Sequence, residues 1–185
     1  MNCAPRAALL CGCWLSALLL ALPAGGNEAG SVSLIDQDGR DFRLDTLHGQ
    51  VVLLVFGFTH CPHICPVEMA RMSAALSELE ASGDEVSGVF ITVDPGRDTP
   101  AVIKSYIEKF HPGIVGLTGA ADALDTVADY YRVRRNEQQL EEGDYLIDHG
   151  YSLYLLDPQG EAQVAVLPGL PPAHIVSLAR ELLQK

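Results

Sequence analysis

The hydrophobic positions of the chain fall into short apolar runs that alternate with segments of helical periodicity. The clearest run covers residues 51–58 and is almost entirely apolar and rich in branched side chains, which is typical of a strand buried on both faces. Directly after it, apolar residues recur at helical spacing from Val67 to Leu79, which predicts a helix that ends near Ala81. The pattern therefore predicts a buried strand joined to a helix by a tight corner.

The rest of the chain repeats this alternation of strands and helices. The pattern predicts strands at 32–35, 41–44, 86–93, 114–117, 151–156 and 162–167, and helices at 101–110, 120–131 and 173–184. Residues 132–143 are polar and without clear period, which indicates an irregular excursion with room for a short strand. This order predicts an α/β domain with a thioredoxin-like fold, in which a mixed central sheet is flanked by helices and preceded by an N-terminal hairpin.

The first residues stand apart from this pattern. Arg6 is the only charged side chain before Glu28. Residues 7–22 are apolar or small, and small residues that suit a cleavage site follow from Pro23. This composition predicts a secretory signal peptide over residues 1–26. Two alternatives stay open: an uncleaved N-terminal membrane anchor, and a lipidation site in the same segment.

The predicted leader changes how the five cysteines are interpreted. Cys3, Cys11 and Cys13 lie within it, so a cleaved protein keeps only Cys61 and Cys65 in its domain, residues 31–185. An exported domain with one close cysteine pair contains either a disulfide or a thiol site that is kept reduced.

Cys61 and Cys65 follow the buried strand in the segment Cys-Pro-His-Ile-Cys-Pro. We expect the first turn of the helix to carry both thiols on one face, with Cα atoms about 6 Å apart. That separation suits either a disulfide or the binding of one metal ion by both sulfurs. A helix N-terminus also favours the thiolate over the thiol. An inert structural disulfide remains the alternative, although so short a loop gives it little entropic stabilisation.

The chain is acidic, with a formal net charge of −12 over 185 residues. This charge argues against nucleic acid or an anionic membrane surface as a partner. It is compatible with cationic or metal-carrying partners.

Residues 56–66 read Phe-Gly-Phe-Thr-His-Cys-Pro-His-Ile-Cys-Pro, and this corner resembles that of the SCO/SenC family. The segment 92–100, Thr-Val-Asp-Pro-Gly-Arg-Asp-Thr-Pro, is similar to its Asp-Pro-x-Arg-Asp-Thr motif, and residues 116–119 and 145–149 match in order. The resemblance covers roughly Ser31 to the C-terminus. It departs at His63, where the family usually has an acidic residue, and beyond Val164, where no motif matches.

The resemblance implies a thioredoxin-like fold with a β-hairpin insertion that binds one copper ion, as Cu(I), Cu(II) or both. Carried over to this sequence, the metal ligands are Cys61, Cys65 and His149. The implied function is a copper metallochaperone that assists assembly of the binuclear copper centre of cytochrome c oxidase. The implied partners are the copper-bearing oxidase subunit and another periplasmic copper chaperone or thiol reductant. We expect an exported, periplasmic protein, soluble or tethered to the membrane through its N-terminus.

The residues themselves are compatible with this ligand set. Thiolates select Cu(I), and imidazole suits copper in both oxidation states. We expect His149 in the loop before a core strand, facing the cysteine corner where thioredoxin-like folds usually present a cis-proline. Asp148 is a candidate for tuning the site. We expect His60 to tune the thiols, His63 to point to solvent, and Arg97 and Asp98 to act mainly in structure.

Three other functions stay open. In the first, Cys61 and Cys65 are the redox-active pair of a thiol-disulfide reductase that serves the oxidase cysteines or another exported protein. A peroxiredoxin-like peroxidase fits less well, because of the second close cysteine. A zinc site that adds His60 and His63 to the two cysteines is a weaker hypothesis, since structural zinc requires all four ligands to close around the ion in one geometry.

Overall fold

A computed structural model of the chain describes residues 28–140, 144–150 and 152–184. The predicted leader, residues 1–26 with its three cysteines, lies outside the described residues. In the described part of the chain, no helix combines the length and the apolar character needed to cross a bilayer.

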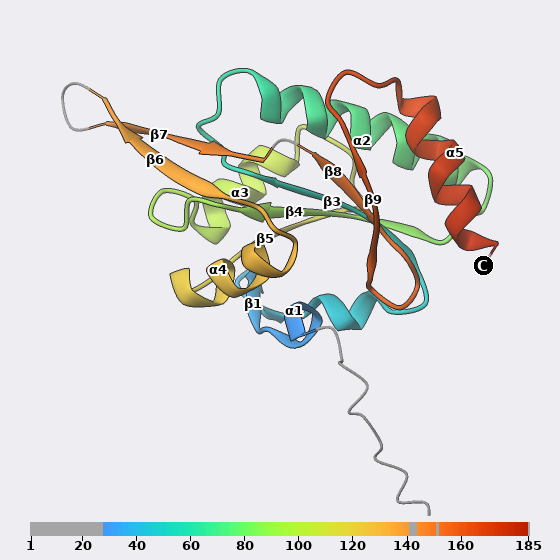
Figure 1. Cartoon of the computed structure of the whole chain (residues 1–185), viewed down its shortest axis with the longest axis horizontal. Coiled ribbons are helices and arrows are strands. Elements are labelled where there is room, and N and C mark those ends of the chain that lie inside the picture. The colour runs from blue at the N-terminus through green and yellow to red at the C-terminus, as the bar shows by residue number, and fades with distance from the viewer. Residues whose placement is uncertain (1–27, 141–143, 151, 185) are drawn as a thin grey trace, which may run out of the picture.

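The fold is built on a seven-stranded mixed sheet (Figure 1). Its strands are β1 (Leu34–Asp36), β2 (Asp41–Phe42), β3 (Val51–Gly57), β4 (Val86–Thr92), β5 (Ile114–Thr118), β8 (Leu153–Leu156) and β9 (Ala162–Val166). They lie in the order β2-β1-β5-β4-β3-β8-β9. Strands β3, β4 and β5 are parallel, whereas β8 and β9 on one side and β1 and β2 on the other are antiparallel. The sheet is therefore mixed, and the N-terminal hairpin β1–β2 is present, as predicted.

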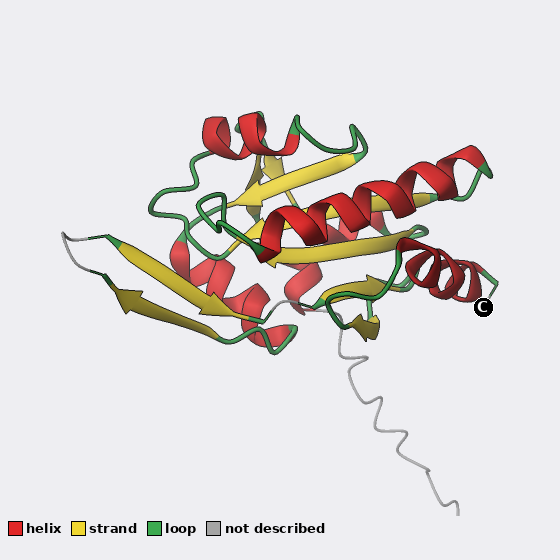
Figure 2. Cartoon of the chain, turned by 90° about the horizontal axis from the view of Figure 1, so that it is seen from above, coloured by secondary structure: helices red, strands yellow, loops and turns green. Residues whose placement is uncertain are grey.

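Helices cover both faces of this sheet (Figures 1 and 2). They are α1 (Glu28–Ser31), the 3-10 helix η1 (Leu44–Leu47), α2 (Ile64–Ala81), α3 (Pro100–Ile107), α4 (Ala121–Tyr130) and α5 (Pro172–Leu183). One apolar core joins α2, α3 and α5 to the sheet, and a second core joins α1 and α4 to the opposite face. Thr99 caps α3 through its hydroxyl, which accepts a hydrogen bond from Val102 N–H, and Pro100 opens that helix.

The side chains of β3 explain why the sequence is apolar at every position there. Successive side chains of a strand point to opposite faces. Val51, Leu53 and Val55 accordingly belong to the core under α2, and the alternate side chains belong to the core on the other face. All seven residues of β3 are buried, so this strand is the centre of the molecule.

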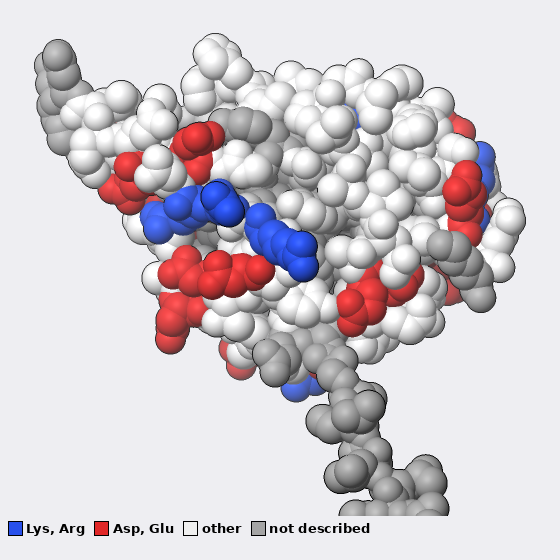
Figure 3. All heavy atoms as spheres, in the orientation of Figure 1, with Lys and Arg blue, Asp and Glu red and all other residues white. Residues whose placement is uncertain are grey.

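Strands β6 (Arg135–Gln139) and β7 (Tyr145–His149) form a hairpin of their own, which extends from the body of the domain (Figure 1). They pair with each other, with Arg135 opposite His149, and form a sheet separate from the main one. All of β6 is exposed, and basic side chains group beside acidic ones in this region of the surface (Figure 3). This hairpin agrees with the expected β-hairpin insertion.

Two local expectations were wrong. Helix α2 begins at Ile64, so Cys65 lies in its first turn but Cys61 lies in the turn before it. The pair Cys-Pro at 61–62 favours this outcome, because the residue before a proline is disfavoured in helical conformation. His149 is the last residue of β7 rather than a loop residue. The pattern missed this strand because polarity does not alternate along it: the apolar Leu146 is exposed and the polar His149 is buried.

Candidate metal and thiol site

The two cysteines lie where the central strand β3 ends and α2 begins. Both are buried and both are free thiols. A methyl group at Gly57, the last residue of β3, would come within 3.0 Å of the Cys65 sulfur and 2.9 Å of the Phe90 ring. Glycine at this position therefore lets the helix and its thiol approach the end of the strand closely. The site lies at the carboxyl end of a parallel strand, where α/β sheets commonly bind their ligands.

A buried carboxylate fixes the turn that leads to Cys61. The side chain of Asp98 is fully buried. It accepts hydrogen bonds from the Thr59 N–H at 3.0 Å, the Thr59 hydroxyl at 2.6 Å and the Thr92 hydroxyl at 2.7 Å. These charge-assisted bonds tie the cysteine turn to the β4–α3 loop. The neighbouring Arg97 pairs with Asp94 and Asp144 rather than with Asp98.

The two thiols differ strongly in acidity. The Cys65 thiol donates a hydrogen bond to the Cys61 sulfur. The backbone N–H groups of residues 63–65 also stabilise the negative charge of the Cys61 thiolate, and together these interactions lower the pKa of Cys61 to about 5. The adjacent Cys61 thiolate and burial raise the pKa of Cys65. The pair therefore loses its first proton from Cys61, at the helix N-terminus.

His149 is brought to the cysteine pair from a distance of more than eighty residues in sequence. Its ring nitrogen Nε2 lies 3.8 Å from the Cys65 sulfur. The other ring nitrogen, Nδ1, lies 2.8 Å from the Gly150 carbonyl oxygen. A carbonyl oxygen only accepts, so Nδ1 carries the proton and the lone pair of Nε2 faces the sulfur. Burial lowers the pKa of His149, which keeps the ring neutral.

These residues fit a soft metal ion. Thiolate and imidazole ligands at bond lengths of about 2.3 and 2.0 Å in a trigonal arrangement have sulfur and nitrogen about 3.7 Å apart. The 3.8 Å contact between Cys65 and His149 matches that separation. Among the described residues, no group of three or more His, Cys, Asp or Glu side chains is placed so that it could hold a metal ion without rearrangement. The Cys61 sulfur accepts the Cys65 N–H at 3.5 Å, so completing a three-ligand site requires side-chain rotation at the pair.

An open groove leads to this site. It has a volume of about 590 Å³ and lies between the start of α2 and the hairpin. Cys61 lines it together with Pro62, Ile64, Leu146 and Pro168. The asymmetric pair is therefore reached through Cys61, the more acidic thiol.

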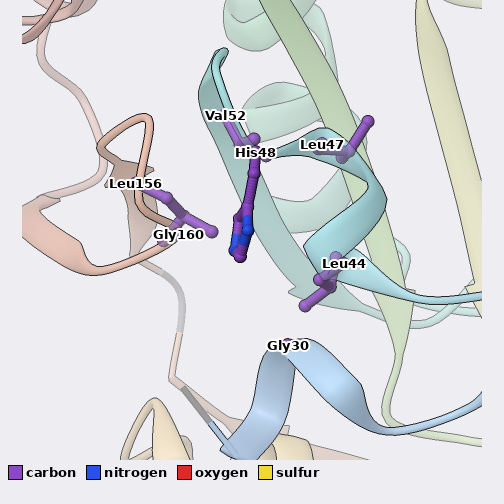
Figure 4. A pocket seen from close by; sticks show the side chains of 7 residues that line it. All are labelled: Gly30, Leu44, Leu47, His48, Val52, Leu156 and Gly160. Atoms are coloured by element: carbon purple, nitrogen blue, oxygen red, sulfur yellow. The ribbon is translucent and has the colours of Figure 1, made fainter. Parts of the chain in front are cut away.

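The other candidate residues fall largely where the sequence placed them. His60 and His63 are exposed; the Nδ1 atom of His60 lies 3.1 Å from the Thr59 hydroxyl, and His63 precedes α2 and lines the groove. The exposed His48 stands at the opposite end of β3, beside a small pocket near Leu47 (Figure 4). Met69 and Met72 are fully buried in the core under α2.

Some neighbours of His149 were not anticipated from the sequence. The Phe58 ring meets the His149 ring edge-on at 5.8 Å between centroids. Tyr145 donates from its hydroxyl to Asp94 at 2.7 Å. Asp148, expected to tune the site, is exposed on the outer face of β7 and lines the groove. The sequence carried no clear signal for this arrangement, because the exposed Leu146 is as apolar as the buried Ile147.

The fold and this site define a thioredoxin-like protein in which a histidine faces the cysteine pair. A sequence model of the SCO1/SenC family matches residues 22–184. The chain belongs to the SCO1/SenC family.

Individual relatives agree with this assignment. The chain is 43% identical over 140 residues to Protein SCO1 homolog 1, mitochondrial, of Arabidopsis thaliana, a match that covers 74% of this chain and 42% of that protein. The crystal structure of Arabidopsis thaliana ScoI with copper bound has a TM-score of 0.77 and 37% identity, and covers 83% of this chain and 96% of that one. BsSco is described as having a disulfide switch and as a member of the Sco family of cytochrome c oxidase assembly proteins. Its structure has a TM-score of 0.65 and 26% identity, covering 82% and 91% of the two chains.

The chain spans about half the length, or less, of the most similar curated relatives that it matches.

Proposed function

We propose that this protein is a copper metallochaperone that binds one copper ion through Cys61, Cys65 and His149. The observation that carries the proposal is the orientation of His149, whose unprotonated Nε2 faces the Cys65 sulfur at 3.8 Å. Two thiolates and one neutral imidazole suit Cu(I) and also accept Cu(II). The copper-bound Arabidopsis relative supports the choice of metal.

The proposed client is the copper-bearing subunit of cytochrome c oxidase, at its binuclear copper centre. The description of BsSco as a cytochrome c oxidase assembly protein supports this choice. Copper is the cargo, and it moves by exchange of thiolate ligands without a change of oxidation state. Cys61 lies in the open groove, so it is the ligand that an incoming thiolate of the client reaches. The proposed location is the periplasm, soluble or tethered through the N-terminus, with another copper chaperone or thiol reductant as a further partner.

A second candidate function is thiol-disulfide reduction of the same client or of another exported protein. The low pKa of Cys61, together with its place in the groove, favours this activity. The Cys61 thiolate attacks a client disulfide, forms a mixed disulfide and releases one client thiolate. Cys65 then loses its proton and displaces the second client thiolate. The client gains two electrons, and the protein is left with a Cys61–Cys65 disulfide that a thiol reductant must reduce.

The variant His149→Ala separates the two functions. For a chaperone, we expect the copper-loaded protein to transfer Cu(I) to a reduced oxidase copper domain, and the variant to lose both copper retention and transfer. For a reductase, we expect the copper-free dithiol to reduce the oxidised domain at equal rates in both proteins. Copper transfer by the variant at the wild-type level would contradict the chaperone proposal.

A further inference from the structure

Among the residues that the structure describes, the strand that carries His149 has no backbone pairing to the main sheet. This strand, β7, pairs with β6, and the two form a sheet of their own. The position of His149 relative to the cysteines therefore depends on the side chains that β7 packs against the domain. This contrasts with the parallel pairing of β3 and β4, which extends over seven residues of β3.

Three side chains of β7 face the domain. Tyr145, Ile147 and His149 alternate with the exposed Leu146 and Asp148. Ile147 is buried in the core on the α4 side of the sheet, and His149 ends the strand at the Cys65 sulfur. Tyr145 is thus the inward residue at the far end of the strand from His149.

Arg97, in the loop between β4 and α3, holds this far end. Its Nη1 donates to the Tyr145 carbonyl oxygen at 3.0 Å and to Asp144 Oδ1 at 2.9 Å. Its guanidinium lies over the Tyr145 ring, with Cζ 3.7 Å from the centroid. On the other side, Nε donates to the buried carboxylate of Asp94, which also accepts the Tyr145 hydroxyl.

The same arginine also reaches toward the histidine end of the strand. Its Cζ lies 5.8 Å from the centroid of Phe58, and the Phe58 ring meets the His149 ring at 5.8 Å. Phe58 immediately precedes Thr59, which Asp98 anchors in the cysteine turn. The β4–α3 loop therefore contacts both parts of the site: Asp98 binds the cysteine turn, and Arg97 binds the strand that carries His149.

We propose that Arg97 is a positioning residue for the metal site, which clamps β7 to the domain so that His149 Nε2 faces Cys65. The proposal rests on the proposed role of His149 as a copper ligand. A planar guanidinium stacks on a ring and donates to a carbonyl and a carboxylate together, which a lysine ammonium cannot reproduce. The clamp thus requires arginine and not merely a positive charge.

The test is a double-mutant cycle that combines Arg97→Gln with His149→Ala in the full chain. Cu(I) affinity is measured by competition with a chelator, and amide hydrogen exchange is measured on the copper-free protein. We expect Arg97→Gln to weaken Cu(I) binding by about 10- to 100-fold, the usual effect of losing support for a ligand. In the His149→Ala background the same change has little further effect, because the ligand that Arg97 positions is gone.

Hydrogen exchange makes the test independent of copper. We expect exchange at residues 145–149 to rise about tenfold in Arg97→Gln, with residues 51–57 unchanged. Arg97→Lys keeps the positive charge but loses the planar fork, so it should weaken Cu(I) binding and raise exchange nearly as much as Arg97→Gln. Arg180→Gln is the matched control, since Arg180 pairs with Asp84 and Glu78 from α5, away from the site; it should change neither.

Two results would overturn the clamp: unchanged exchange at 145–149, or an equal loss of Cu(I) affinity in the presence and absence of His149. Equal copper binding by the wild type and His149→Ala would instead refute the ligand assignment. The exchange measurement would then still decide whether Arg97 holds the strand.

Discussion

The cysteine corner and the β6–β7 hairpin bring their ligands to the site by different physical means. The corner follows β3, which is buried along its whole length and paired to β4 and β8. The hairpin forms its own sheet, and one of its two strands is fully exposed. The sulfurs thus lie on the most constrained part of the fold, and the imidazole lies on an appended part.

This difference separates two properties of the site. The acidity of Cys61 arises within the corner, from the Cys65 thiol and the backbone N–H groups of residues 63–65. The placement of His149, the proposed third ligand, depends on side-chain contacts between the hairpin and the domain, through Tyr145, Ile147 and Arg97. Changes in the hairpin should therefore alter metal binding while leaving thiol chemistry intact.

The largest expected contrast is in thiol reactivity. A lowered pKa keeps a thiol ionised at lower pH, so Cys61 stays largely thiolate down to about pH 5. At about pH 6 an ordinary cysteine, with a pKa of about 8.5, is ionised to only about three parts in a thousand. We expect iodoacetamide to alkylate Cys61 between pH 6 and 8 at a nearly constant rate, with the rate falling below about pH 5, while Cys65 stays unreactive. Mass spectrometry of alkylated peptides measures both rates.

The pH profile of Cys61 should be the same in His149→Ala, because the groups that lower its pKa, the Cys65 thiol and the backbone N–H groups, all lie in the corner. If the pH profile of this variant moves toward that of an ordinary cysteine, the acidity of Cys61 depends on the hairpin as well as on the corner.

A second expected contrast is in stability. Leu53 on β3 is fully buried, and Leu53→Ala should lower the free energy of unfolding by about 2–5 kcal/mol. Leu146 on β7 is exposed, and Leu146→Ala should change it by less than about 0.5 kcal/mol. Urea denaturation compares the two, and similar losses would show that the hairpin is as integral to the fold as β3.

A smaller effect is expected for the buried carboxylate. Asp98→Asn keeps the shape but replaces one acceptor oxygen with a donor that faces the Thr59 and Thr92 donors. We expect a loss of about 1–3 kcal/mol of stability in thermal or chemical unfolding. The exposed Asp38, paired with Lys104, is the control, and Asp38→Asn should have little effect on stability because solvent screens an exposed ion pair. Equal effects would remove Asp98 as the anchor of the cysteine turn.

The smallest effect is expected for His63. It is exposed at the start of α2, so His63→Ala should weaken Cu(I) binding by less than about tenfold, the lower end for residues that support a ligand. A chelator competition assay beside the wild type measures it. A larger loss would mean that His63 joins the metal site.

Much of the fold was predictable because its pattern is local. The apolar run of β3 and the helical spacing after it reveal the strand and α2, and the turn residues at 157–160 reveal the hairpin of β8 and β9. The start of α2 was missed by a few residues, since proline at position 62 shifts it beyond Cys61. The strand β7 was interpreted as a loop because the polarity of its residues does not alternate as their burial does.

The residues of the site also differ in how far the sequence reveals them. Cys61 and Cys65 are evident from their spacing alone, but His149 could be singled out only through the family resemblance. The roles of Asp98 and Arg97 were not accessible, because each acts on residues that are distant in sequence: Thr59 in one case and Tyr145 in the other. Such contacts follow from the meeting of loops at the carboxyl ends of β3 and β4, which sequence periodicity does not specify.

The most direct test of the central claim is X-ray absorption at the copper edge of the Cu(I)-loaded protein and its His149→Ala variant. The proposed site predicts two sulfur ligands and one imidazole nitrogen in the wild type, and loss of the nitrogen with both sulfurs retained in the variant. A nitrogen ligand that persists in the variant, or a wild-type site with sulfur ligands alone, would contradict the assignment of His149.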